Sequence, residues 1–394
     1  MFQPVVASAQ DVARGTSVRD LPRKGYEPRD IRVGHTVIRL EADASASYDS
    51  NVFATSRDER DDIVFQLRPR VEAESNFGTT RARYLAYAGL RKFADNSRED
   101  SLAFGASISG NHEIDRSNSI AATAQYDRAI ESRADPERRA GALDPPRKID
   151  VLFSDFRFAH RGARFGFDLA GAVQRFDYLS SIDDDRDLSI YRGSVTGSIR
   201  LASLDVFAEA YVNRRDFDQA VDFTGVDRDA TTYGFLVGGR RELTGRLRGR
   251  LGVGVFRSEP ADASLSPFSG FSASGDLTWT PRARTVVSVT AFSGDVATVR
   301  SGASGRTDTR LSVKVEQEAR HNLLLRGGVS YLRTRFRGIS GQTQSTYSAD
   351  VEAEYLINRH VSAFSSLAYV KRRAQRVVDR FDRSVFMLGV RFRY

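Results

Sequence analysis

The 394-residue sequence predicts an all-β fold, an antiparallel up-and-down β-barrel of about 18 strands, with 16 as the alternative, that spans a membrane. Apolar and polar side chains alternate along most of the chain, and alternation with a period of two is typical of strands. Short and long connections alternate between the expected strands. No apolar run reaches the roughly 18 residues that a spanning helix needs. The mean hydropathy of −0.40 agrees with a barrel, because every second residue of its strands is polar.

The first predicted strand follows Gly34, where Ile38 and Leu40 alternate with Arg39 and Glu41. Two more strands are expected at about 63–74 and 82–91, joined by a short turn. Apolar residues occur at both parities near 149–159 and 360–371, so the facing of these two strands stays open. The remaining strands are predicted at 101–111, 119–128, 149–159, 164–177, 188–200, 203–213, 231–240, 246–257, 270–280, 283–294, 308–319, 322–334, 346–357, 360–371 and 384–394.

The lengths of the connections indicate how the strands are joined. A barrel with tight periplasmic turns and long outer loops produces strict short and long alternation. A sandwich or propeller has no reason to keep that order over the whole chain. The long connections are 129–148, 178–187, 214–230, 258–269, 295–307, 335–345 and 372–383, and the short ones lie between them.

The last stretch, 384–394, carries large apolar side chains at every second position and ends on aromatic residues. In a transmembrane barrel this face meets lipid and its aromatic residues lie at the headgroup level. The stretch resembles the C-terminal targeting strand of outer-membrane barrels, with Gly389, Phe392 and Tyr394 as the predicted assembly signal and Met387 as a departure. The alternative is the last strand of a soluble sandwich.

The N-terminal region differs in composition from the rest of the chain. Residues 1–32 are expected to be a remnant signal and periplasmic lead-in, and residues 33–394 the barrel. Ala7-Ser8-Ala9 resembles a cleavage site for a signal peptide, although only six residues precede it and a chance match is the alternative.

The opening segment also resembles the putative β-barrel porin 2 family. The points of resemblance are Arg19, Pro22, Tyr26, Pro28, Gly34 and the run Tyr48–Phe53. The resemblance implies a barrel in the cell outer membrane whose relatives often accompany exopolysaccharide synthesis and secretion. It implies no catalytic residue.

If the apolar faces meet lipid, the opposite faces line the lumen. The predicted pore-lining residues are Arg39, Arg68, Arg70, Arg81, Arg83, Arg91, Arg248, Arg250, Glu72, Glu74, Asp350 and Glu352. Arginine and carboxylate ladders side by side are typical of the transverse field of a diffusion channel. The alternative is a salt-bridged wall that only stiffens the barrel.

The composition argues against several other functions. The chain has no cysteine, and its five histidines (His35, His112, His160, His321 and His360) are all expected near the periplasmic rim. We therefore expect no enzyme, no metal site and no cofactor. The net charge of +8 comes from arginines spread along strands, without a nucleic-acid motif, so no nucleic acid is expected. The acidic loop 183–187 lacks the pattern of a calcium loop and is expected to be solvated.

The sequence therefore predicts a channel that exports a polysaccharide or another polar or anionic solute. A general or anion-preferring diffusion porin and a structural barrel with a closed pore are the alternatives. The expected partners are outer-membrane lipid and lipopolysaccharide, the barrel-assembly machinery and polysaccharide-export components.

Overall fold

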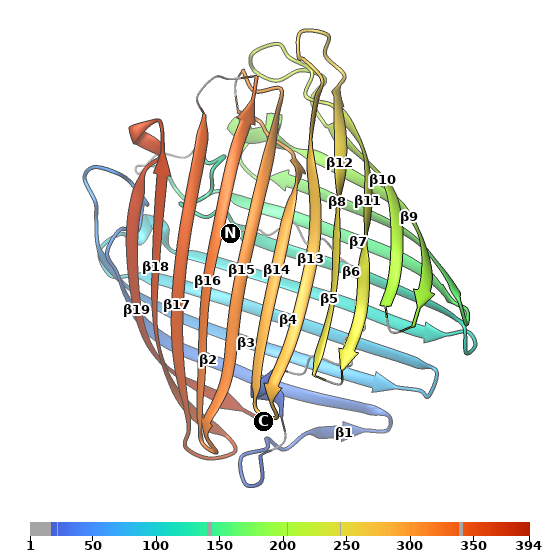
Figure 1. Cartoon of the computed structure of the whole chain (residues 1–394). Helices are drawn as coiled ribbons and strands as arrows, with labels where there is room; N and C mark the ends of the chain where they lie inside the picture. Colours follow the sequence, from blue (N-terminus) through green and yellow to red (C-terminus); the bar gives the residue numbers. More distant parts are fainter. Residues whose placement is uncertain are drawn as a thin grey trace.

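A computed structural model describes residues 17–21, 23–139, 144–202, 204–244, 246–300, 302–338 and 342–394. Within these residues, eighteen antiparallel strands, β2 to β19, form a closed ring in which each strand pairs with its neighbours in sequence (Figure 1). The ring closes where β19 pairs with β2 in a register that sets Arg391 opposite Asp43 and Phe392 opposite Ala42. The predicted barrel of 18 strands is confirmed, and the alternative of 16 is wrong.

The strands are long enough to cross a bilayer at a tilt, at 12 to 16 residues each. The strands of the ring are β2 (Thr36–Asp49), β3 (Asp62–Asn76), β4 (Thr80–Phe93), β5 (Ser101–Glu113), β6 (Asn118–Ile130), β7 (Lys148–Arg161), β8 (Phe165–Tyr178), β9 (Leu188–Leu201), β10 (Leu204–Phe217), β11 (Ala230–Thr244), β12 (Leu247–Pro260), β13 (Phe268–Arg282), β14 (Thr285–Val296), β15 (Gly305–Arg320), β16 (Leu323–Arg337), β17 (Thr343–Leu356), β18 (Val361–Ala374) and β19 (Phe381–Arg393).

Short turns lie at one end of the barrel, the turn end, and long connections at the other, the loop end (Figure 1). The predicted alternation of connection lengths is therefore confirmed. Three short 3-10 helices, η3 (Ser97–Glu99), η4 (Ser181–Arg186) and η5 (Val377–Asp379), lie in loops of the loop end. At the turn end, β1 (Ile31–Val33) forms a small hairpin with β2, and Gly34 has the positive φ of 59° that its tight turn requires.

The outer surface of the ring is apolar. Leu251, Val253 and Val255 on β12 are exposed, whereas Phe256 and Ser258, of the opposite parity, are buried. The same division resolves the two strands whose facing was open. On β18, Phe364 is buried inward and Leu367 is exposed outward, because the interior at this point is filled by side chains.

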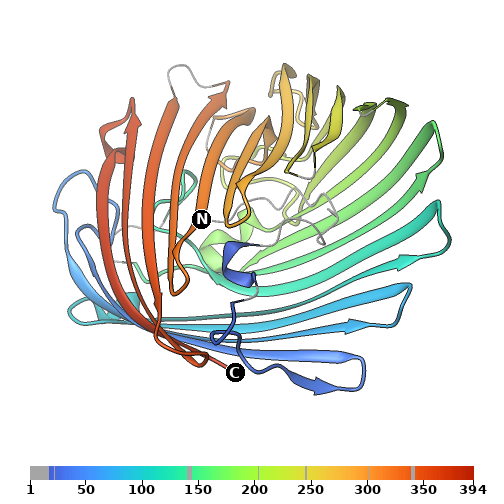
Figure 2. The same cartoon turned by 60° about the horizontal axis from the view of Figure 1, so that its bottom comes forward.

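A segment before the barrel lies inside its turn end. Figure 2 shows the 3-10 helix η2 (Val18–Asp20) within the ring of strands. Val18 is buried against Val286, Leu324 and Leu356, so the segment is packed against the wall. The expected cleavage site at residues 7–9 lies outside the described residues. Among those described, no helix has the length and apolar character needed to cross a membrane.

Candidate functional site

The interior of the barrel is identified by contacts between strands that are not neighbours. Tyr211 of β10 hydrogen-bonds Ser272 of β13 at 3.0 Å. Arg250 of β12 pairs with Glu209 of β10. Side chains on the convex outer face diverge, so contacts that skip a strand are made on the concave side. These contacts establish which parity of β10, β12 and β13 faces inward, and the strand register extends the assignment to the other strands of the ring.

All twelve residues expected to line the pore share the parity of the inward-facing residues of their strands. At the turn end of β2–β4, arginines and glutamates alternate. Arg83 pairs with Glu72 at 2.7 Å, Arg70 with the same carboxylate at 2.8 Å, and Arg39 with Glu74 at 3.3 Å. Five of the twelve residues thus form one network.

Three further arginines on the same strands form no ion pair with any residue that the structure describes: Arg68, Arg81 and Arg91. Arg68 and Arg81 are exposed to the interior. Arg91 is mostly enclosed, its Nε has no hydrogen-bond partner among the described residues, and its guanidinium lies 5.2 Å from the ring centroid of Phe93. A cavity of about 160 Å³ lies beside it.

The strand register orders these side chains along the wall. From the turn end to the loop end the sequence is Arg81, Arg83, Arg70, Arg68 and Arg91, which we call the basic stripe. Adjacent strands lie about 4.8 Å apart, so the five cations occupy one band of the interior. Because only Arg83 and Arg70 pair with a carboxylate, the band carries net positive charge.

The other predicted lining residues lie elsewhere in the interior. Glu352 pairs with Arg326, and Asp350 is exposed. Arg248 forms no ion pair within the described chain, whereas Arg250, which pairs with Glu209, lies 4.2 Å from the ring of Phe207.

An apolar patch in the interior was not predicted. Phe207, Leu236 and Phe256 point inward and are at most 4% exposed. Glycines provide the room, since a side chain at Gly238 or Gly252 would meet the Phe207 ring. The signal in the sequence was the number of glycines in β11 and β12.

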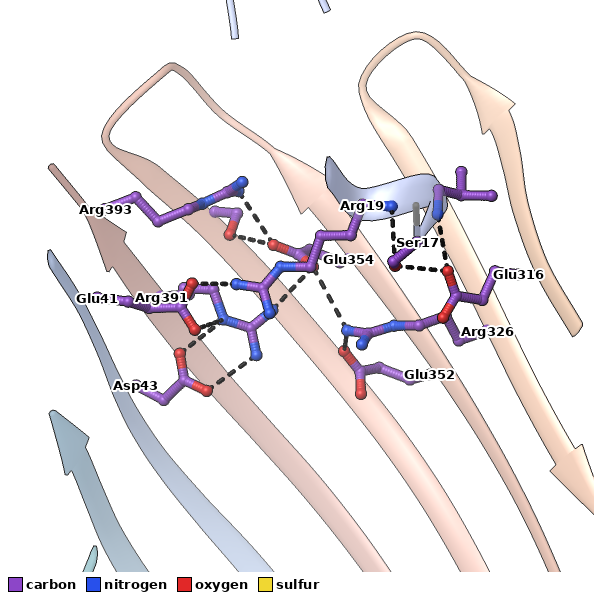
Figure 3. Close-up of polar contacts among 12 residues, drawn as sticks. Ser17, Arg19, Glu41, Asp43, Glu316, Arg326, Glu352, Glu354, Arg391 and Arg393 are labelled. Carbon is purple, nitrogen blue, oxygen red and sulfur yellow. Dashed lines mark hydrogen bonds and ion pairs between the residues drawn. The ribbon is translucent and has the colours of Figure 1, made fainter. Parts of the chain in front are cut away.

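A buried ion-pair cluster occupies the turn end near the closure of the ring (Figure 3). The side chain of Glu354 is 1% exposed and accepts hydrogen bonds from Arg391 at 2.8 Å, Arg393 at 3.0 Å and Ser362 at 2.7 Å. Arg391 also holds Asp43 through two bonds of 2.6 and 2.9 Å. A planar guanidinium that binds two carboxylates fixes the positions of both.

The segment before the barrel is attached to this cluster. Arg19 pairs with Glu41 and approaches Glu354 at 3.9 Å. Ser17 Oγ and the amide of Val18 donate to Glu316 at 2.6 and 2.8 Å. Residues 17–19 are therefore bound to strands β2, β15 and β17, and they narrow the turn end of the lumen.

The connection between β6 and β7 is described at residues 131–139 and 144–147, and these residues lie across the loop end. On its near side, Arg133 pairs with Glu99, Glu131 with Arg186 at 2.6 Å, and Arg147 with Asp183 at 2.7 Å. Burial raises the pKa of Glu131, although the guanidinium of Arg186 beside it acts in the opposite direction.

The far side of the same connection contacts the opposite wall. Glu137 accepts a hydrogen bond from Thr298 at 2.7 Å and pairs with Arg306 of β15 at 3.4 Å. Arg372 of β18 donates to the carbonyl oxygen of Ala134. In a ring of eighteen strands, β15 lies nine places from β6, which is half the circumference. The connection, hereafter the crossing loop, therefore spans the diameter of the barrel.

The expectation of a solvated acidic loop at 183–187 is wrong. Asp183 and Asp185 are 1% and 8% exposed. Arg147 forms an ion pair with Asp183, and Arg139 of the crossing loop forms one with Asp185 at 2.5 Å. The unusual length of the 129–148 connection was the one sequence signal for a loop that folds inward.

The described residues contain no group of three or more histidine, cysteine or acidic side chains placed to hold a metal ion. All five histidines lie at the turn end, as predicted, where His112 hydrogen-bonds Thr80 and His160 hydrogen-bonds Asn118. The interior thus presents guanidinium groups and carboxylates as its chemistry.

Comparisons with known proteins found similar solved structures and one matching family model. The solved structures that resemble the chain include OccAB3 of Acinetobacter baumannii, with 13% identity, coverage of 92% of this chain and 100% of that one, and a TM-score of 0.47. They also include the outer-membrane protein opdK of Pseudomonas aeruginosa, with 10% identity, coverage of 91% and 99%, and a TM-score of 0.44. For the FrpB iron transporter of Neisseria meningitidis the identity is 11%, the coverage 91% and 63%, and the TM-score 0.45.

No curated protein sequence matches the chain. The model of one family, described as putative beta-barrel porin 2, matches residues 24–394 and so covers nearly the whole chain. The turn end is then the periplasmic side and the loop end faces the exterior. The chain belongs to the putative beta-barrel porin 2 family and is a porin-like barrel of the outer membrane.

Proposed function

We propose that this barrel is a non-enzymatic diffusion channel that prefers small anionic solutes, such as acidic sugars and carboxylates. The observation that carries the proposal is the basic stripe on β3 and β4. Its members Arg68, Arg81 and Arg91 have no carboxylate partner among the described residues, and the first two are exposed to the interior. Guanidinium groups that line a path favour the entry of anions and match the planar geometry of carboxylates.

The crossing loop favours a small solute over a polymer. Glu137 at its far side is joined to Thr298 and Arg306 on the opposite wall, so the loop divides the loop end of the lumen. A polysaccharide chain could pass only if these contacts opened. Polysaccharide export therefore stays a prediction, and it requires displacement of the loop.

The test is ion selectivity in planar bilayers. The purified barrel is compared with the variant Arg68→Gln, Arg81→Gln, Arg91→Gln. A matched control replaces three outward-facing arginines, Arg175→Gln, Arg214→Gln, Arg257→Gln, and so removes the same charge from the other face. We expect the lumenal variant to lose anion preference and the control to keep it.

The difference in anion preference between the wild type and the lumenal variant should grow as the salt is diluted, since the screening length rises from about 10 Å at 0.1 M salt to about 30 Å at 0.01 M. Equal selectivity of the wild type and the lumenal variant would show that the basic stripe does not determine the anion preference. If neither wild type nor a variant lacking the crossing loop conducts, the protein is a closed structural barrel.

A further inference from the structure

The outward face of β16 and β18 carries four cationic side chains near the loop end: Arg333, Arg335, Lys371 and Arg373, hereafter the outer basic patch. The three arginines are exposed and Lys371 is half-buried. None of the four forms an ion pair with a residue that the structure describes. Asp382 lies opposite Lys371 in the strand register, yet the two side chains are not paired.

Elsewhere on the same rim, five outward-facing cations have acidic partners within the protein, whereas the exposed Lys148 has none among the described residues. The pairs are Lys92–Asp100 at 2.6 Å, Arg128–Asp150 at 2.5 Å, Arg175–Asp218 at 2.6 Å, Arg214–Asp216 at 2.7 Å and Arg257–Glu259 at 2.9 Å. The outer basic patch differs from these pairs because four cations lie close together and none of them forms an ion pair among the described residues.

The strand register places the patch relative to the membrane. Tyr331, Tyr347 and Lys371 lie level on β16, β17 and β18, and the next outward-facing row toward the loop end is Arg333, Ser345 and Arg373. The rings of Tyr331 and Tyr347 lie 5.2 Å apart. Tyrosines at the rim of a barrel lie at the headgroup level, and two residues of strand rise about 7 Å. The arginine row is thus at the height of the polar headgroups.

Arginine side chains at this height meet the groups that the outer leaflet offers. Guanidinium forks bind phosphate oxygens in pairs, and a cation near an anionic membrane surface is attracted to it. Directly toward the membrane centre the same strands expose Val329, Val351 and Leu367, which provide an apolar surface for acyl chains.

We propose that the outer basic patch binds the phosphate groups of a phosphorylated glycolipid of the outer leaflet, with its acyl chains along β16–β18. The site is independent of the solute that passes through the lumen. It is on the opposite face of the wall, and its ligand is held by the membrane.

The experiment measures the lipid that remains on the intact barrel. The full chain is placed in phosphatidylcholine vesicles that contain a diphosphorylated glycolipid, extracted in mild detergent, and weighed with its bound lipid by native mass spectrometry. Parallel arms use the same glycolipid without phosphates, and inorganic phosphate alone. The patch variant combines Arg333→Gln, Arg335→Gln, Lys371→Gln and Arg373→Gln. The control variant combines Lys92→Gln, Arg175→Gln, Arg214→Gln and Arg257→Gln.

We expect the wild type and the control to retain the phosphorylated glycolipid. The amount of glycolipid on the patch variant should be lower by at least about tenfold. The variant Arg333→Lys, Arg335→Lys, Arg373→Lys keeps the charge without the fork and should retain an intermediate amount. Heat-modifiable mobility on gels establishes that each variant is folded.

Four outcomes overturn the proposal. Equal retention by the folded patch variant would show that the patch does not hold the lipid. Equal retention of the glycolipid without phosphates would mean that the acyl chains alone bind, and binding of inorganic phosphate would identify a soluble ligand. Dimers of the wild type that disappear in the patch variant, without loss of bound lipid, would assign the surface to a second copy of the chain.

Discussion

The ring of Phe364 on β18 occupies the space that a side chain at Gly389 on β19 would need. The two residues are opposite each other in the register, and a Cβ built at Gly389 would lie 2.3 Å from Cζ of Phe364. Phe364 is 6% exposed, and the guanidinium of Arg391 lies 5.0 Å from its ring centroid. Aromatic rings that cover glycines on a neighbouring strand stabilise sheets. Gly389, expected as part of an assembly signal, thus has a packing role as well.

Gly389→Ala should destabilise the barrel by about 1–3 kcal/mol, because the new methyl group overpacks a buried site. Unfolding in urea, followed by heat-modifiable mobility, measures the loss. Gly197→Ala is the control, since no atom lies within 4 Å of its Cβ. Adding Phe364→Leu should recover part of the loss in the Gly389→Ala background. If the two substitutions were simply additive, the contact would not be the cause.

A charge on the lipid-facing side should impair folding more than the same charge in the lumen. Val253 is 42% exposed on the outer face in the middle of β12, and Val253→Arg should cost about 2–4 kcal/mol. Thr290→Arg places the same side chain at mid-strand on the inner face of β14, where the residue is exposed. We expect this control to fold normally in vesicles. Equal losses in the two variants would mean that the assignment of faces is wrong.

The pair of Glu137 and Arg306 should hold the crossing loop against the far wall. Glu137→Gln removes the charge and should weaken this attachment by about 1.5–3 kcal/mol, the contribution of a hydrogen bond to a charged group. We expect higher single-channel conductance and faster hydrogen exchange in residues 131–139. Glu259→Gln, at an exposed pair on the outer face, is the control. Unchanged exchange and conductance would show that other contacts hold the loop.

The order of the loop 179–187 should depend on pH through Asp187. Burial raises the pKa of Asp187 to about 6, assisted by the charges of Asp177, Asp184 and Asp218, while the amide of Tyr178 acts in the opposite direction. The unfolded value is about 3.9, so the folded loop binds this proton more tightly. The stabilisation of the folded loop by protonated Asp187 is complete below about pH 4 and is lost as the pH rises through about 6.

Hydrogen exchange of residues 179–187, corrected for intrinsic rates, should therefore be slower at pH 5 than at pH 7.5. Asp187→Asn keeps the oxygen that accepts from Tyr178 and removes the charge, so its loop should be protected at both values. Asp216→Asn, at the exposed pair with Arg214, serves as the control. A wild-type loop that exchanges more slowly at pH 7.5 would reverse the sign and refute this account.

The sequence alone determined the barrel, its eighteen strands and the facing of most of them. Each strand is a local pattern of period two, as in 247–257, where Leu251 and Val253 alternate with Arg250 and Gly252. The order of the strands followed from connection lengths, because an up-and-down barrel joins neighbours in sequence. The inward parity of the predicted lining residues could be inferred for the same reason.

The tertiary structure decided which side chains meet inside. Glu137 pairs with Arg306 across 169 residues, and Glu354 with Arg391 across 37. These contacts depend on the curvature of the closed ring and on the path of the crossing loop, which no period in the sequence describes. The facing of 360–371 was undecided in the sequence because Phe364 and Leu367 are both apolar. Only the folded interior, where Phe364 covers Gly389 while Leu367 meets lipid, distinguishes them.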